Sequence, residues 1–228
     1  MGELKTQNEK AVVRLMIIAL VPFYLSAVVL HHENIMDLAN SRAWQAFLGL
    51  TVISVGPIVC LHVILRLVAN NVGPRWKERL AHLRWHHPLP GSRADALIRK
   101  DSRIDVSTLP PQVTALLNDS MSPHERNAYW YSTIFRKVRD TSAVSNTHRT
   151  YLLYREAAAG TFVLFWVTVS FDLIGRGAYG LPLMTLSAYV VSAVYLLLLI
   201  GAANQAGNRM VTGAIANFTL GQPQGDTE

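Results

Sequence analysis

The stretch SAVSNTHRTYLLYREAAAGTFVLFWVTVSFDLI (Ser142–Ile174) changes character in its middle. Its first half carries histidine, arginine and hydroxyl side chains, and the half that follows Glu156 is almost entirely apolar. A helix over these residues is about 50 Å long at 1.5 Å per residue, whereas the hydrocarbon core of a bilayer is about 30 Å thick. The stretch therefore predicts a rigid helix that crosses a membrane and projects well beyond it.

Three other stretches are nearly free of charge and approach the length that a membrane-crossing helix needs. They are Leu15–Leu30, Trp44–Leu65 and Leu181–Gln205. Only 16% of the 228 residues are charged, against about 25% in soluble domains. A backbone in lipid must satisfy its own hydrogen bonds, so these stretches predict helices. The expected fold class is mainly α, a polytopic membrane protein with four transmembrane helices in two hairpins.

The two hairpins flank a basic, mostly helical cytosolic insert. We place an N-terminal tail and the first hairpin at 1–70, the insert at 71–156, the second hairpin at 157–205 and a cytosolic tail at 206–228. The insert holds fourteen Lys and Arg against eight Asp and Glu, whereas the loops after the first and third spans hold only Arg42 and Arg176. Because Lys and Arg stay on the cytoplasmic side, we expect both termini and the insert there.

Two properties of the chain limit its processing and chemistry. Cys60 is the only cysteine, so neither an intrachain disulfide nor a cysteine-based zinc site can form. The residues after Leu30 offer no small-x-small cleavage motif, so we expect the N-terminal segment to be retained as a signal anchor.

The sequence predicts local structure for three segments of the insert. Gly73-Pro74 opens a helix on which Trp76, Leu80 and Leu83 recur at helical spacing, either as an interfacial helix at the lipid headgroups or as an ordinary surface helix. Ser122-Pro123-His124-Glu125 has the pattern of a capping box and predicts a helix over Pro123–Arg139. The segment Pro88–Pro111 is predicted to be rich in loops, with a short strand over 104–106.

A row of polar side chains follows one face of the predicted second span. His62 and Arg66 are four residues apart, and Ser54 and Asn70 extend the row at the same spacing or its multiple. Such a row usually faces protein or water, so it indicates a pore lining or a polar seam between helices. The alternative is that Arg66 only reaches up to the cytoplasmic boundary, as Arg14 would on the first span.

Other charged and aromatic residues indicate the membrane boundary. Trp76 and Arg79 are of the types favoured at headgroups. Asp172 precedes Arg176 by four residues, the favourable order for a helical ion pair. We expect this pair at the external interface, and the alternative for Asp172 is a carboxylate on an ion pathway.

Two basic clusters in the insert are candidates for binding a phosphate-bearing ligand such as a nucleotide, or a soluble protein partner. They comprise Arg99, Lys100, Arg103, Arg136, Lys137 and Arg139. The alternative is that they reflect only the cytoplasmic bias of positive charge and the anionic inner leaflet. Nucleic acid is not favoured, because the clusters lack interleaved aromatic residues.

The sequence predicts no catalytic residue, no cofactor and no metal. It has no G-x-S-x-G, H-E-x-x-H or phosphate-binding glycine loop. His82, His86 and His87 suggest metal binding only superficially, because adjacent histidines on one helix do not easily bind one ion. We therefore expect a protein without enzymatic activity.

Four segments of the insert resemble a recurrent arrangement in small bacterial membrane proteins of uncharacterised function. They are LPGSRA (Leu89–Ala94), DSRID (Asp101–Asp105), WYSTIFRKVRD (Trp130–Asp140) and HRTYLLYRE (His148–Glu156). The resemblance implies a multi-pass protein of the bacterial inner membrane with four spans, and it transfers no site residue. By analogy, such proteins serve as membrane effectors in bacterial defence or stress responses.

The functional prediction is a homo-oligomeric membrane effector or pore-forming subunit whose insert senses a partner or an anionic ligand. Small residues that allow close helix contact, such as Gly160 and Gly201, favour self-association. The alternative is a membrane anchor or scaffold that recruits a soluble partner and conducts nothing.

Overall fold

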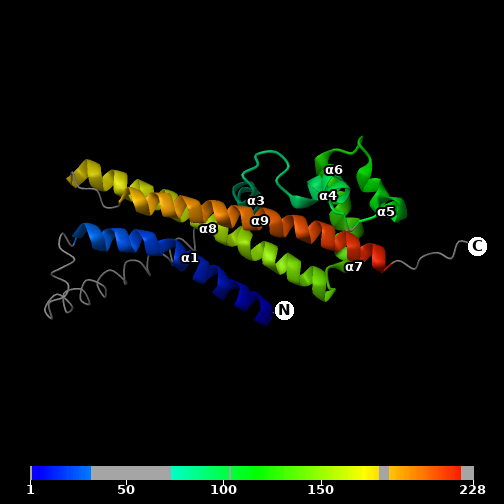
Figure 1. Cartoon of the computed structure of the whole chain (residues 1–228), viewed down its shortest axis with the longest axis horizontal. Coiled ribbons are helices and arrows are strands. Elements are labelled where there is room, and N and C mark those ends of the chain that lie inside the picture. Colours follow the sequence, from blue (N-terminus) through cyan, green and yellow to red (C-terminus); the bar gives the residue numbers. More distant parts are fainter. Residues whose placement is uncertain (1, 32–72, 103, 180–184, 222–228) are drawn as a thin grey trace, which may run out of the picture. The chain divides into compact units, whose positions relative to one another are not determined.

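The chain folds into helices alone wherever its structure is described. The computed structural model describes residues 2–31, 73–102, 104–179 and 185–221. All the regular elements in these ranges are helical (Figure 1). The prediction of a mainly α fold is therefore confirmed for this part of the chain.

The helices differ greatly in length, from single turns to rods of 38 residues. In chain order they are α1 (Gly2–His31), α3 (Pro74–His82), η2 (Pro90–Arg93), α4 (Ala94–Lys100), η3 (Val106–Thr108), α5 (Pro111–Thr114), η4 (Ala115–Leu117), α6 (Pro123–Tyr129), η5 (Trp130–Phe135), α7 (Arg136–Val138), α8 (Ser142–Tyr179) and α9 (Leu186–Leu220).

Among the described helices, α8 and α9 are long and apolar enough to cross a membrane. The predicted helix from Ser142 through the apolar half is found, and it continues to Tyr179. The predicted first span lies within α1, which contains Pro22. The predicted second span, Trp44–Leu65, lies outside the described residues, so the layout of four spans stays a prediction.

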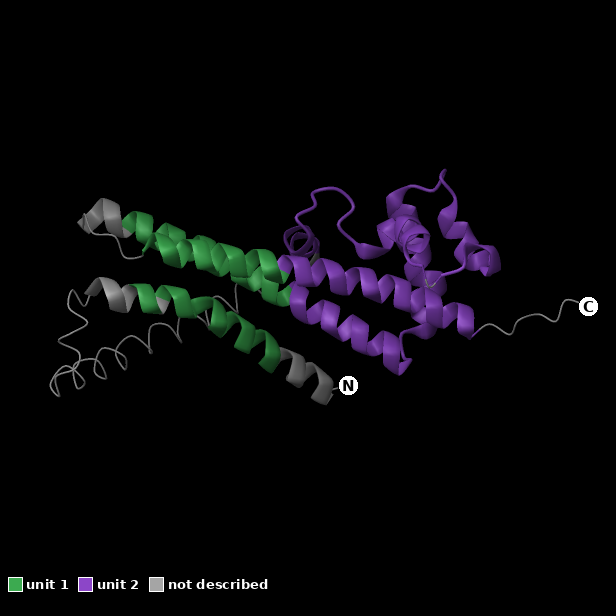
Figure 2. Cartoon of the chain, viewed as in Figure 1, with its two compact units in different colours: residues 1–74, 156–199 green, residues 75–155, 200–228 purple. Residues whose placement is uncertain are grey.

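The chain divides into two compact units, coloured separately in Figure 2. Unit 1 comprises residues 1–74 and 156–199, and unit 2 comprises residues 75–155 and 200–228. The helices α8 and α9 each contribute a segment to both units.

Unit 1 is held together by contacts of α1 with α8 and with α9. Gly160 on α8 faces Met16 on α1 so closely that an added Cβ would lie 2.9 Å from the methionine sulfur. The Tyr195 hydroxyl on α9 donates to the backbone carbonyl of Leu15 at 2.9 Å. Gly160, a residue expected to help copies associate, is thus used for packing within one chain.

Unit 2 has an apolar core built from the insert and the last part of α9. Its fully or nearly fully buried members are Ala94, Ile98, Val113, Leu116, Trp130, Ile134, Phe135, Val138, Val144, Tyr151, Ala206, Met210, Val211, Ala214, Ile215 and Phe218. Residues 206–228 are predicted to form a tail, whereas in the structure α9 continues to Leu220 and buries its apolar face. The reason is that apolar residues recur there at helical spacing and complete the core of the insert.

The region predicted to be rich in loops contains more helix than expected. The elements η2 and α4 cover Pro90–Lys100, and Ala94 and Ile98 are buried. The short strand expected over 104–106 was wrong, because η3 begins at Val106 and the Asp105 carboxylate caps it by accepting from the Ser107 amide at 2.9 Å.

The predicted capping box is confirmed. The Ser122 side chain accepts from the Glu125 amide at 3.3 Å, and the Glu125 carboxylate accepts from the Ser122 amide at 3.0 Å. The helix after it is not regular, however, because residues Trp130–Phe135 form a π-helical segment between α6 and α7. Trp130 and Phe135 are both buried in the core, 3% exposed each, so burial of both rings accompanies the wider turn.

Candidate functional site: a buried polar network on three helices

The inward face of α3 is polar. Glu78 and His82 lie one turn apart and are 6% and 4% exposed, and Ala81 between them is fully buried. Trp76 on the same helix is 51% exposed. The apolar residues that suggested an amphipathic helix thus include an exposed tryptophan. The face of α3 that packs against the rest of unit 2 carries an acid and a histidine.

Both carboxylate oxygens of Glu78 receive hydrogen bonds from α8. The Tyr151 hydroxyl donates to Oε2, and Nη1 of Arg155 donates to Oε1 at 2.7 Å. Tyr151 and Arg155 are themselves one helical turn apart, so α8 presents them on one face. Two pairs at a spacing of four residues, separated by more than 70 positions in the chain, thus meet side by side.

His82 links this pair of helices to α9. Its Nδ1 lies 2.8 Å from Oδ1 of Asn204, and the Asn204 amide nitrogen donates to the Ile200 carbonyl at 3.1 Å. That second bond fixes the orientation of the amide, so its oxygen faces the ring and Nδ1 must carry a proton.

The other ring nitrogen of His82 faces α3 and α8. Its Nε2 lies 3.2 Å from the Tyr151 hydroxyl and 3.6 Å from Oε2 of Glu78. Both ring nitrogens therefore have polar neighbours, the Asn204 amide oxygen on one side and the Tyr151 hydroxyl and the Glu78 carboxylate on the other.

The ionised state of Glu78 agrees with its surroundings. Burial alone would raise the pKa of its carboxyl, but the hydrogen bonds from His82 and Tyr151 and the positive charge of Arg155 outweigh that effect and lower the pKa below its ordinary value. This carboxylate accepts hydrogen bonds from Arg155 and from the Tyr151 hydroxyl and so joins α3 to α8, and the contact of His82 with Asn204 adds α9.

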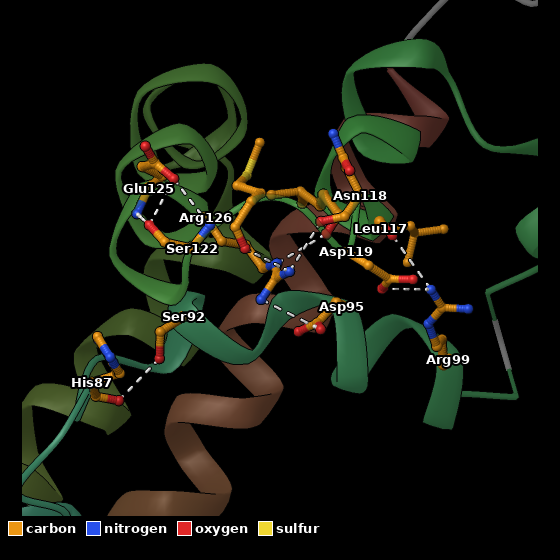
Figure 3. Close-up of polar contacts among 12 residues, drawn as sticks. His87, Ser92, Asp95, Arg99, Leu117, Asn118, Asp119, Ser122, Glu125 and Arg126 are labelled. Carbon is orange, nitrogen blue, oxygen red and sulfur yellow. Dashed lines mark hydrogen bonds and ion pairs between the residues drawn. The ribbon is translucent and has the colours of Figure 1, made fainter.

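A second buried charge, Arg126 on α6, has a structural role. Its Nε donates to the Leu116 carbonyl at 3.1 Å, its Nη2 donates to the carbonyls of Asn118 and Met121 at 3.2 and 3.1 Å, and its Nη1 lies 3.4 Å from a carboxylate oxygen of Asp95 (Figure 3). All three guanidinium nitrogens therefore have partners, and the arginine joins α4, η4 and α6.

The predicted basic clusters stay candidates, and the structure gives some of their members local partners. Arg99 lies 3.6 Å from the Asp119 carboxylate (Figure 3), Arg139 lies 3.4 Å from that of Asp140, and the Lys137 amine lies 5.5 Å from the centre of the Phe218 ring. Lys100 and Arg136 are exposed, and Arg103 lies outside the described residues.

The residues predicted to lie at the membrane interface differ in their exposure. Arg14 is exposed on α1, and Asp172 on α8 is 3% exposed. The side chain of Arg176 is outside the described part, so the proposed pair with Asp172 stays a prediction. The polar row of Ser54, His62, Arg66 and Asn70 also lies outside the described residues.

Trp76 and Arg79 belong to an exposed group with Trp85. The Arg79 guanidinium lies 5.2 Å from the centre of the Trp76 ring and 6.0 Å from that of Trp85, and the two indole rings meet edge to face at 6.2 Å. Trp76 and Trp85 are 51% and 68% exposed. We call these three residues the tryptophan patch.

Sequence reasoning missed most of the buried network. It treated His82 only as a metal candidate and did not single out Glu78, Tyr151, Arg155 or Asn204. The available signals were two pairs of polar residues at helical spacing and one amide inside an apolar stretch. No family model, curated protein or solved structure matches this chain, so the family resemblance stays a prediction.

Proposed function

We propose that the chain is an integral membrane protein in which α8 and α9 cross the bilayer and also carry a helical domain, unit 2, outside the lipid. In this proposal it acts as a homo-oligomeric effector or pore-forming subunit of a bacterial inner membrane, and unit 2 receives a soluble partner or an anionic ligand. Both termini and unit 2 lie in the cytoplasm.

The observation that carries the proposal is a change of exposure along α9. In unit 1 this helix exposes large apolar side chains, whereas from Ile200 onward it buries them and leaves only Leu220 exposed. The exposed apolar residues of unit 1 are Ile17, Ile18, Val21, Leu25, Trp166, Phe171, Leu173, Ile174, Leu186, Val190, Val191, Val194, Leu197 and Leu198. A core helix of a soluble protein would bury such residues, so lipid is the environment that fits them.

The tryptophan patch supports a place for α3 at the headgroups. Indole rings and arginine are both favourable at the membrane–water boundary, and the stacked arginine stays solvated on one side. Trp76 and Arg79 of the patch lie on α3, which also carries the buried Glu78 and His82, and Trp85 follows the end of this helix.

The buried network supports a coupling role for α3. It connects α3 with α8 and with α9, the two helices that continue into unit 1. A ligand or partner that moves α3 must therefore break charged hydrogen bonds or pull on these two helices. This gives a signal received by unit 2 a physical route to the membrane.

The membrane topology is tested by cysteine labelling in intact cells. With Cys60 replaced by serine, Arg99→Cys and Arg136→Cys should resist a membrane-impermeant maleimide until the cells are opened. A carbonate wash should leave the protein in the membrane pellet. Labelling of either cysteine from outside, or release by carbonate, would overturn the proposal.

The effector role is tested by mass and by ion flux. The protein purified in detergent should have the mass of an oligomer, and vesicles that contain it should leak ions. His62→Leu should reduce the leak if the polar row lines the pathway. A protein that is strictly monomeric and causes no ion flux would rule out the pore-forming role.

A scaffold that conducts nothing is the second candidate. It is favoured by the polar residues of unit 1, since Thr161, Thr168, Asp172 and Ser192 are 2–6% exposed and thus point into the interior of one chain. Gly160 likewise packs on Met16 of the same chain. Capture of a soluble partner by vesicles that show no leak would establish this second function.

A further inference from the structure

Arg93, at the end of η2, is partly buried and differs from Arg126 in how its guanidinium is hydrogen-bonded. Its Nε and Nη2 atoms are fully shielded from solvent and have no hydrogen-bond partner among the described residues. These two nitrogens form the edge of the guanidinium that binds carboxylate or phosphate oxygens in a bidentate manner. On Arg126 the same edge is filled by three backbone carbonyls.

A buried hydrogen-bond donor without an acceptor destabilises the folded protein, and two such donors on one side chain increase this cost. Burial lowers the pKa of Arg93, the positive charge of Arg84 lowers it further, and an electrostatic interaction with Tyr151 acts in the opposite direction. Arg84 is exposed and makes no side-chain ion pair within the described part of the chain. Its charge is therefore also available to an anion.

The backbone that carries Arg93 is held rigidly from two sides. A Cβ added to Gly91 would lie 2.6 Å from the Trp130 ring, and one added to Gly207 would lie 2.9 Å from the Pro90 ring. The η2 turn is thus clamped between the π-helical segment and α9. The Ser92 hydroxyl, 3.0 Å from the His87 carbonyl, ties the preceding loop to the turn (Figure 3).

We propose that the unfilled edge of Arg93, together with Arg84, binds a phosphate group. A dianionic phosphate matches the two positive charges and supplies the two oxygens that the edge lacks. The group belongs either to a free phosphate compound or to the headgroup of an anionic lipid. The proposal deepens the anionic-ligand part of the proposed function and rests on that function only for the role of the ligand, because binding is measured apart from ion flux.

The experiment measures thermal unfolding of the full chain in a phosphate-free detergent. Sodium pyrophosphate is titrated against sodium chloride at equal ionic strength. A parallel arm compares nanodiscs of phosphatidylcholine with nanodiscs that also contain phosphatidic acid. Binding should raise the unfolding midpoint in one arm. A response to pyrophosphate identifies a free compound, and a response to phosphatidic acid alone identifies a headgroup.

Variants assign the response to this site. Arg93→Gln should weaken binding roughly ten- to a hundredfold, as expected for lost charge-assisted hydrogen bonds. Arg93→Lys keeps the charge but loses the bidentate edge and should also weaken binding. Arg84→Gln, at an exposed position, keeps the test valid if the Arg93 variants fail to fold. Arg75→Gln is the matched control, because Arg75 is an exposed arginine that lies outside the predicted basic clusters.

The proposal is overturned if neither probe raises the midpoint, or if the rise is the same in the Arg93 and Arg84 variants as in the wild type. Water alone would then fill the edge of Arg93. A positive binding result in a protein without ion flux would leave this site in place and remove only the pore-forming role.

Discussion

Replacement of Tyr151 by phenylalanine tests the buried network directly. The change removes one oxygen, which bridges Glu78 and His82, and keeps the ring that stacks on the His82 imidazole at 5.8 Å. A hydrogen bond to a charged group contributes about 1.5–3 kcal/mol. Two hydrogen bonds are lost, one of them to the Glu78 carboxylate, but Nε2 of His82 can approach Oε2 of Glu78 from its present 3.6 Å and offset part of the loss.

We therefore expect Tyr151→Phe to lower the free energy of unfolding by about 2–3 kcal/mol. For a chain of this size the unfolding midpoint should fall by roughly 4–12 °C. The measurement is the loss of helical circular dichroism on heating in detergent. Tyr131→Phe is the matched control, because Tyr131 is 50% exposed and its hydroxyl should contribute less than about 0.5 kcal/mol.

A double variant sharpens the test. If Tyr151 and Glu78 interact, the combined cost of Tyr151→Phe and Glu78→Gln should be smaller than the sum of the single costs by more than about 0.5 kcal/mol. Equal midpoints for Tyr151→Phe and Tyr131→Phe, or strict additivity of the two network changes, would refute the reasoning.

Three further tests use the pH dependence of the network, two glycines of α9 and the capping box. Because the folded-state pKa of Glu78 lies below its ordinary value of 4.5, wild-type stability should be level above pH 4.5 and fall as the pH drops below it; in pH-dependent unfolding, Glu78→Gln should flatten that fall. Gly207→Ala would bring a Cβ to 2.9 Å from Pro90 and should lower the free energy of unfolding by about 1–3 kcal/mol. At Gly201 an added Cβ meets no atom within 4 Å, so Gly201→Ala should stabilise α9 by up to about 1 kcal/mol. Thermal unfolding measures both effects. Ser122→Ala removes the capping box and should cost about 1 kcal/mol in the same measurement, with no loss if the box is not formed in solution.

The local signals of the sequence were sufficient for several elements. The pattern Ser-Pro-His-Glu predicts where a helix starts. The capping serine hydroxyl, the proline ring and the glutamate carboxylate all lie within four residues. The helix from Ser142 could be predicted except for its last residues, up to Tyr179, because helix-compatible residues continue from its polar half into its apolar half. Both features depend on neighbours in the chain and need no knowledge of distant contacts.

Other elements depended on packing that the sequence reasoning did not use. Hydropathy alone ended the last span near residue 205, although the apolar residues that follow keep a helical period and enter the core of unit 2. The π-helical turn at Trp130 arises where two aromatic rings must both be buried, with Trp130 packed against Gly91. The residues next to Trp130 in the sequence do not identify Gly91 as the residue against which it packs.

By itself, the sequence determined an α-helical chain with long apolar helices and a basic segment that carries helices of its own. Only the tertiary structure decided that Glu78, His82, Tyr151, Arg155 and Asn204 form one site, and that Arg126 is satisfied while the edge of Arg93 is not. The physical reason is range. Helix starts and apolar runs follow from interactions within a few residues, whereas the partners of a buried polar side chain lie up to 122 positions away and are chosen by the packing of whole helices.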